Sequence, residues 1–197
     1  MPSPRWAPGT AKRAIVPTLT AELWIRVEVV SDLDTDRFGT FTREIPREGG
    51  ARETARLKAR AAMEAHSRGL ASEGSFRPHP SVPFVAGGVE LVLLIDRESS
   101  FELTGVDVTM ETNFAFTCVT TVDEAHSFAA QVSFPSHALI VIAAPQEKPE
   151  PALGMNKGIV DPVWFEQAVE QTLRVHRCAW IETDMRAHLN PTRMRSI

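Results

Sequence analysis

Two carboxylates in the sequence are spaced so that a helix and the strand after it could bring them together. Glu53 falls in the first turn of a helix that we predict over residues 51–66. Glu73 follows a predicted strand that ends with Leu70 and Ala71. Mg²⁺ prefers oxygen ligands and keeps several of its waters. Glu53 and Glu73 could therefore hold this ion, and Glu73 could activate one of the waters.

Each carboxylate also has a purely structural interpretation. An acidic residue in the first turn of a helix complements the positive end of the helix dipole, as Glu53 would. The run from Ser72 to Ser75 has the composition of an exposed turn, in which Gly74 would permit a sharp bend. In the functional interpretation, Ser75, the last residue of this turn, is a candidate substrate ligand.

A third polar stretch covers residues 182–194, near the C-terminus. Arg186 and Arg193 have guanidinium groups suited to phosphate oxygens, and His188 lies between them. The alternative is a solvated tail in which Asn190 caps a helix that starts at Pro191.

A serine and a histidine stand next to each other at Ser136 and His137 and suggest a hydrolase. We expect them on a strand, where adjacent side chains point to opposite faces and do not form a nucleophile and base pair. No G-x-S-x-G motif supports this activity either.

The clearest predicted element is the helix over residues 51–66. Ala55, Ala59 and Ala62 fall on one face, and charged residues fall on the opposite face. Such small residues permit a close approach to a sheet, so this helix could position both Glu53 and Lys58.

Further elements alternate along the chain. Capping residues predict helices that start at Thr121 and at Asp161. A strand pair is expected around a turn at residues 98–100. Apolar runs predict strands over residues 89–98, 101–111, 137–144 and 178–184. The predicted class is α/β, with a mixed sheet flanked by helices.

Composition limits the classes of function. The formal net charge of -4 and the pI near 5.9 disfavour general nucleic-acid binding. No apolar run approaches the roughly 20 residues of a membrane helix, and a cytoplasmic location is expected. A single domain over residues 1–197 is expected, with residues 1–10 and 145–155 irregular. Cys118 and Cys178 are interpreted as small buried side chains rather than as a disulfide.

The stretch "GGARETARLKARAA" followed by "LASEGS" resembles the inosine triphosphate pyrophosphatase superfamily, in which a Glu-Asn-Ala-x-x-Lys-Ala helix precedes an Ala-Asp-Asp-Ser-Gly turn. The whole chain more closely resembles an uncharacterised bacterial family of unknown function. The motifs that carry this closer resemblance are "DTDRFGTF", "ETARLKA", "ASEGSF", "ETNFA", "FPSH" and "ETDMRAHLNPTRM".

The superfamily resemblance implies a pyrophosphatase-like fold and assigns roles to individual residues. Glu53 would bind Mg²⁺, and Glu73 would bind the metal or activate water. Lys58 matches the lysine of the helix motif and would contact phosphate, as would Lys12 in "APGTAKR". Arg186 and His188 would lie in the C-terminal substrate-binding segment. The resemblance also implies a homodimer.

Three functions follow from these observations. The first is a Mg²⁺-dependent hydrolase of a nucleotide or another phosphorylated small molecule, such as a non-canonical nucleoside triphosphate, with residues 32–50 as a lid. The second is a non-catalytic module of the same fold that binds a nucleotide or a partner. It is favoured because "APGTAKR" lacks the asparagine of the Thr-x-Asn-x-x-Lys phosphate loop found in the pyrophosphatases. The third is another hydrolase or transferase that uses Asp34, Asp36 and His137 or His188.

Overall fold

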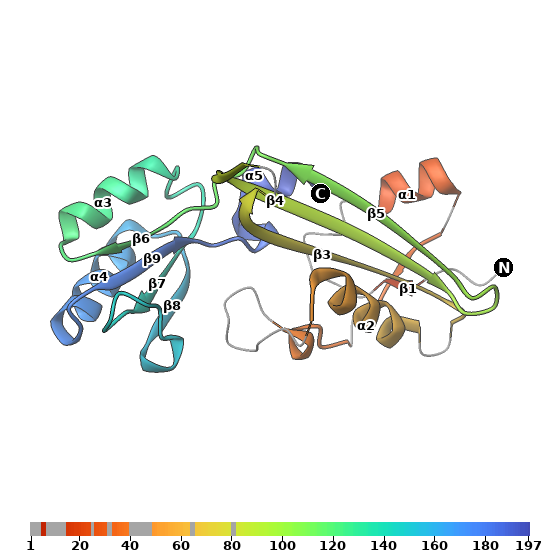
Figure 1. The fold of residues 1–197 in the computed structure, drawn as a ribbon, viewed down its shortest axis with the longest axis horizontal. Helices are drawn as coiled ribbons and strands as arrows, with labels where there is room; N and C mark the ends of the chain where they lie inside the picture. The colour runs from red at the N-terminus through yellow and green to blue at the C-terminus, as the bar shows by residue number, and fades with distance from the viewer. Residues whose placement is uncertain are drawn as a thin grey trace. The chain divides into compact units, whose positions relative to one another are not determined.

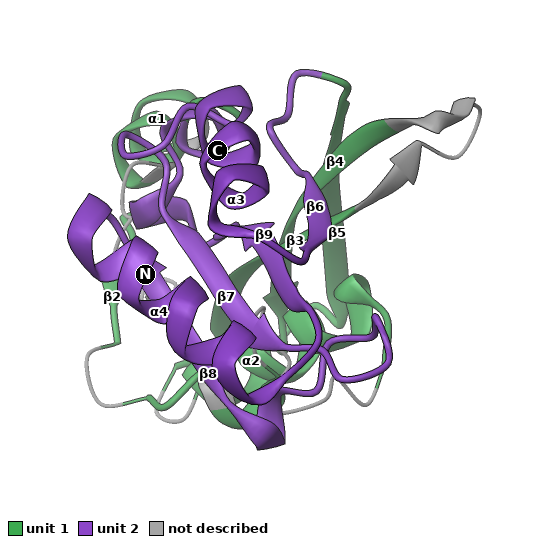
Figure 2. Cartoon of the chain, turned by 90° about the vertical axis from the view of Figure 1, so that its left-hand side faces the viewer, with its two compact units in different colours: residues 1–40, 45–110, 195–197 green, residues 41–44, 111–194 purple. Residues whose placement is uncertain are grey.

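The computed structural model describes residues 5–6, 15–24, 26–30, 33–39, 49–63, 66–79 and 82–197. The chain groups into two compact units, shown in different colours in Figure 2. The first comprises residues 1–40, 45–110 and 195–197, and the second comprises residues 41–44 and 111–194. In the described ranges, no helix is long and apolar enough to cross a membrane. Each unit has its own hydrophobic core. The single domain expected from the sequence stays a prediction.

The first unit is built on a five-stranded sheet in the order β2-β1-β3-β4-β5 (Figure 1). β1 pairs in parallel with β2 and β3, whereas the β3–β4 and β4–β5 pairs are antiparallel. Its elements are β1 (Arg5–Trp6), α1 (Ile15–Leu23), β2 (Glu28–Val29), η2 (Asp36–Phe38), α2 (Ala51–Met63), β3 (Arg68–His79), β4 (Val82–Asp96) and β5 (Phe101–Thr109). The predicted α/β class is confirmed.

α1 and α2 lie on opposite faces of this sheet. Successive residues of β3 and β4 point to opposite sides, so each helix meets a different set of side chains. The face under α2 consists of small and aliphatic residues, namely Ala55, Ala59, Ala71, Leu91 and Leu93. The other face packs against α1 through Val16, Leu19, Leu70, Val92 and Leu94. The close approach expected of α2 is confirmed, and it requires Gly69, where a Cβ atom would collide with the carbonyl oxygen of Ala59.

The predicted hairpin is confirmed, but the predicted turn at Ser72–Ser75 is wrong. β4 and β5 pair from Gly88 to Thr109 around the turn at residues 97–100. Ser72–Ser75 instead continue β3, and each residue has a partner on β4. The turn prediction assumed that Glu73 needs solvent, whereas in the structure its charge meets a lysine of α2.

The second unit has a four-stranded antiparallel sheet in the order β6-β9-β7-β8, with α3 and α4 packed on one face. Its elements are β6 (Phe116–Val119), α3 (Val122–Gln131), β7 (Leu139–Ala143), η3 (Pro151–Leu153), β8 (Met155–Ile159), α4 (Pro162–Val175), β9 (Ala179–Thr183), η4 (Ala187–Leu189) and α5 (Pro191–Arg195). The helix starts are confirmed: Thr121 accepts a hydrogen bond from the Glu124 amide, and Asp161 accepts one from the Trp164 amide.

Cys118 and Cys178 form a disulfide, so the expectation of two unpaired cysteines is wrong. β6 and β9 are neighbours, and Cys118 lies directly opposite Trp180. Cys178 is therefore only two residues away along the facing strand, with 6.0 Å between the two Cα atoms. The cytoplasmic location stays a prediction, and a disulfide is unusual in that compartment.

Candidate functional site

A buried ion pair joins Lys58 of α2 to Glu73 of β3. The Lys58 side chain is 13% exposed and the Glu73 side chain 3% exposed. Glu73 lies on the face of β3 that α2 covers, because it is two residues from Ala71 in that core. The short Ala55 and Ala59 side chains bring the helix close enough for Lys58 to reach this carboxylate. Lys58 and Glu73 were both candidate site residues, and the structure brings them together.

Glu53 does not join this pair. Its side chain is 49% exposed and pairs with Arg56, three residues along the helix. At about 100° per residue, Glu53 and Lys58 lie about 140° apart around α2. Glu53 therefore leaves α2 on a different side from Lys58, which meets Glu73 of β3, and each of the two carboxylates has a basic partner.

The Glu53 side of α2 carries an arginine cluster that the sequence did not reveal. Arg52 and Arg56 both donate hydrogen bonds to Glu102 of β5, and Arg56 also donates to Glu53. The hydrogen bonds from Arg56 lower the pKa of Glu102 to about 2. Burial raises this pKa, and the hydrogen bond from Arg52 lowers it further. Glu102 stays ionised at neutral pH and holds α2 against the start of β5. No local pattern links residues 50 positions apart.

The described residues do not form a magnesium site around Glu53 and Glu73. Among them, no group of three or more His, Cys, Asp and Glu side chains is placed to hold a metal. Glu73 is neutralised by Lys58, and Glu53 points elsewhere. The residues present therefore do not fit Mg²⁺, and their roles as metal ligands stay predictions. Lys12 lies outside the described residues, as do residues 40–48 of the expected lid.

A second polar centre lies in the second unit at the end of β9. Asp184 is 0% exposed. Its carboxylate accepts hydrogen bonds from the Arg186 amide, the Arg186 guanidinium and the Gly158 amide. Gly158 adopts a φ of +73°, and a Cβ atom there would lie 3.0 Å from Arg186 Nη2. The predicted substrate ligand Arg186 is thus part of a fixed carboxylate–guanidinium pair.

Arg193 and His188 differ in their surroundings. Arg193 is buried, and its guanidinium donates a hydrogen bond to the Met185 carbonyl. His188 is exposed in η4. The predicted Asn190 cap is confirmed, since its side-chain oxygen accepts from the Arg193 amide. Asn190 is fully buried, however, so this segment is not a solvated tail.

The prediction that Ser136 and His137 lie on a strand is wrong. They lie in a turn and not on a strand, and Ser136 Oγ is 3.0 Å from His137 Nδ1. The Thr192 amide donates to His137 Nε2, so in the neutral ring the proton is on Nδ1 and points toward Ser136. Ser136 Oγ donates in turn to the Ser133 carbonyl. His137 in this tautomer holds no free lone pair for the serine proton, and the two side chains do not form a nucleophile and base pair.

The predicted site residues belong to two units. Glu53, Lys58, Glu73 and Ser75 lie in the first, and Arg186, His188 and Arg193 lie in the second. Ser75 is half-buried in β3, opposite Val89. Sequence reasoning missed Asp184 as the hydrogen-bond centre of the C-terminal segment, although a carboxylate two residues before an arginine at a strand end is a signal that could have indicated it.

One family model matches most of the chain. Residues 58–197 match the family described as a domain of unknown function, DUF6671. The chain therefore belongs to this family, which confirms the expectation of a family of unknown function. No curated protein and no solved structure shows a significant match to the chain.

Proposed function

We propose that this member of the DUF6671 family is a module that binds a nucleotide or another phosphorylated small molecule through Lys58 in its first unit. The observation that supports this proposal is the number of hydrogen-bond donors that the Lys58 ammonium group keeps unused within the described ranges. It has three N–H donors, and Glu73 is its one partner among the described residues. Two donors remain for phosphate oxygens, while Glu73 holds the side chain in place.

A second candidate is the Mg²⁺-dependent hydrolase with the pyrophosphatase-like fold. It is supported by the resemblance of "ETARLKA" and "ASEGS" to the helix and turn of the superfamily, and by the position of Glu73 as a carboxylate beneath α2. We place it second because Glu53 faces another side of α2. The chemistry of Glu73 would then depend on groups beyond the described residues.

The two candidates are separated by measuring binding and turnover on the same protein. We expect canonical and deaminated nucleoside triphosphates, titrated by calorimetry with and without Mg²⁺, to bind the wild-type chain, and Lys58→Gln to weaken this binding about tenfold. Release of phosphate and pyrophosphate is followed in parallel. We expect none above background from a binding module.

Lys148→Gln serves as the control, because Lys148 is an exposed lysine outside the first unit. Turnover that disappears in a folded Glu73→Gln variant would overturn the binding module and establish the hydrolase. Binding that is the same in Lys58→Gln and Lys148→Gln would exclude Lys58 as the phosphate contact.

We also propose that the expected homodimer forms through β5. This strand is last in the sheet order, so one of its edges has no neighbour among the described strands. Four apolar side chains on it, Phe101, Leu103, Val106 and Val108, are each at least 50% exposed. Antiparallel pairing of two copies about Gly105 would place Glu102 opposite Val108 and Asp107 opposite Leu103. No like charges would then face each other directly.

Val106→Lys is expected to convert this dimer to a monomer, because the pairing would bury a lysine next to Thr104 of the second copy. Light scattering after size exclusion measures the mass. Val175→Lys is the matched control, since Val175 is 76% exposed at the end of α4. A wild-type chain that is monomeric at high concentration, or a Val106→Lys variant that stays dimeric, would contradict the proposal.

A further inference from the structure

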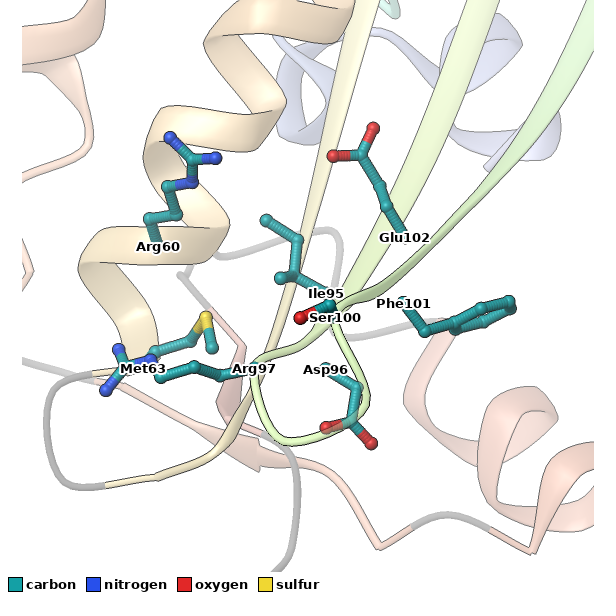
Figure 3. Close-up of a pocket in the computed structure, with 8 residues that line it drawn as sticks. All are labelled: Arg60, Met63, Ile95, Asp96, Arg97, Ser100, Phe101 and Glu102. Carbon is teal, nitrogen blue, oxygen red and sulfur yellow. The ribbon is translucent and has the colours of Figure 1, made fainter.

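A cavity of about 410 Å³ opens between the end of α2 and the β4–β5 turn in the first unit (Figure 3). It lies on the side of α2 that carries Arg56 and Arg60 and does not include Lys58 or Glu73. Its volume is within the range of small-molecule sites. Ile95 lies in the middle of the view, with Arg60 and Met63 on the helix side and Glu102 on the β5 side.

The two carboxylates that line this cavity are already neutralised. Glu102 accepts hydrogen bonds from Arg52 and Arg56. Asp96 pairs with Arg68, and its other oxygen accepts hydrogen bonds from the amides of the β4–β5 turn. The Arg68 pair is the first cause of a lowered pKa for Asp96. Neither carboxylate therefore leaves unbalanced negative charge in the cavity.

Two guanidinium groups of the lining have no such partner. Arg60 and Arg97 make no side-chain hydrogen bond or ion pair with any residue of the described ranges. Figure 3 shows Arg97 reaching from the turn toward the last turn of α2, beside Met63. The turn that carries Arg97 is held by Asp96 and by a hydrogen bond from the Arg97 amide to the Ser67 carbonyl. The site is thus positively charged, and the backbone that carries Arg97 is held in place.

The inner wall of the cavity is apolar. Met63 is buried, and Ile95 is partly buried against the core beneath α2. An anion without an apolar part would leave this surface in contact with water, whereas an organic anion would cover it. We propose that this cavity binds a small organic anion, with its phosphate or carboxylate held by Arg60 and Arg97 and its apolar or aromatic body over Met63 and Ile95.

Phenyl phosphate is a suitable probe, because it combines a dianion with an aromatic ring. Its binding to the full chain is followed by the backbone amide signals of the ¹⁵N-labelled protein. We expect shifts at residues 60–63 and 95–102. In the Arg60→Gln/Arg97→Gln double variant we expect affinity to fall at least about tenfold, since two charge-assisted contacts are lost. Arg177→Gln, an exposed arginine of the second unit, is the control.

Competing probes separate the two parts of the proposal. Benzyl alcohol that binds at these signals as tightly as phenyl phosphate would overturn the role of the arginines. Inorganic phosphate that binds as tightly would overturn the role of the apolar wall. A double variant that melts at a lower temperature but binds phenyl phosphate as the control does would show that the arginines act only on stability. Each of these results differs from a failure at Lys58, because Lys58 does not line this cavity.

Discussion

Lys58→Met is expected to lower the free energy of unfolding by about 3–5 kcal/mol, because it takes the Lys58 ammonium group away from the buried Glu73 carboxylate. Glu73 is 3% exposed in the middle of β3, with α2 packed over it, so water cannot easily replace the lysine. Chemical denaturation followed by circular dichroism measures the loss. Removing one member of a buried pair costs more than the pair itself contributes, since the remaining charge cannot be solvated.

The double variant Lys58→Met/Glu73→Leu provides the sharper test. Without either charge, the site becomes an apolar extension of the core beneath α2, and we expect a stability close to that of the wild type. Lys148→Met is the control for loss of a lysine at an exposed position. A single variant that loses no more stability than this control would show that Glu73 reaches solvent. A double variant as unstable as the single one would show that the pair makes contacts beyond its mutual charge.

Asp184→Ala is expected to cost about 3–5 kcal/mol of stability in the second unit. Asp184 is fully buried and accepts hydrogen bonds from the Gly158 amide, the Arg186 amide and the Arg186 guanidinium. Its removal takes the carboxylate acceptor away from the partly buried Arg186 guanidinium and from the half-buried Gly158 amide. The change in the denaturation midpoint measures this loss.

Two comparisons make the Asp184 result specific. Asp123→Ala removes an exposed carboxylate from the first turn of α3 and should cost less than about 1 kcal/mol. Asp184→Asn keeps the size and one acceptor oxygen, so its loss should lie between those of the two alanine variants. If Asp184→Ala and Asp123→Ala were equally mild, the carboxylate would not be the centre of this segment, and Arg186 would be available for another ligand.

Elements specified by local pattern were predicted well. The alanine face of α2 gave both the helix and the side that packs on the sheet. The caps at Thr121, Asp161 and Asn190 are confirmed because a cap depends on residues no more than three positions apart. The hairpin of β4 and β5 is also local. Lys58 and Glu73 were both predicted as site residues, but Lys58 was expected to contact phosphate and Glu73 to bind a metal. Their pairing with each other was not predicted.

The tertiary structure decided the features that depend on residues distant in sequence. Ser72–Ser75 looked like a turn, whereas in the structure they continue β3 and the buried Glu73 pairs with Lys58 of α2. Cys118 and Cys178 carry no pairing signal until β6 and β9 are neighbours. The sequence by itself determined the helices, the hairpin and the α/β class, because these follow from spacing along the chain. Which charges meet, and therefore which carboxylates are free for chemistry, was decided by packing, because a buried charge depends on whichever partner the fold brings within reach.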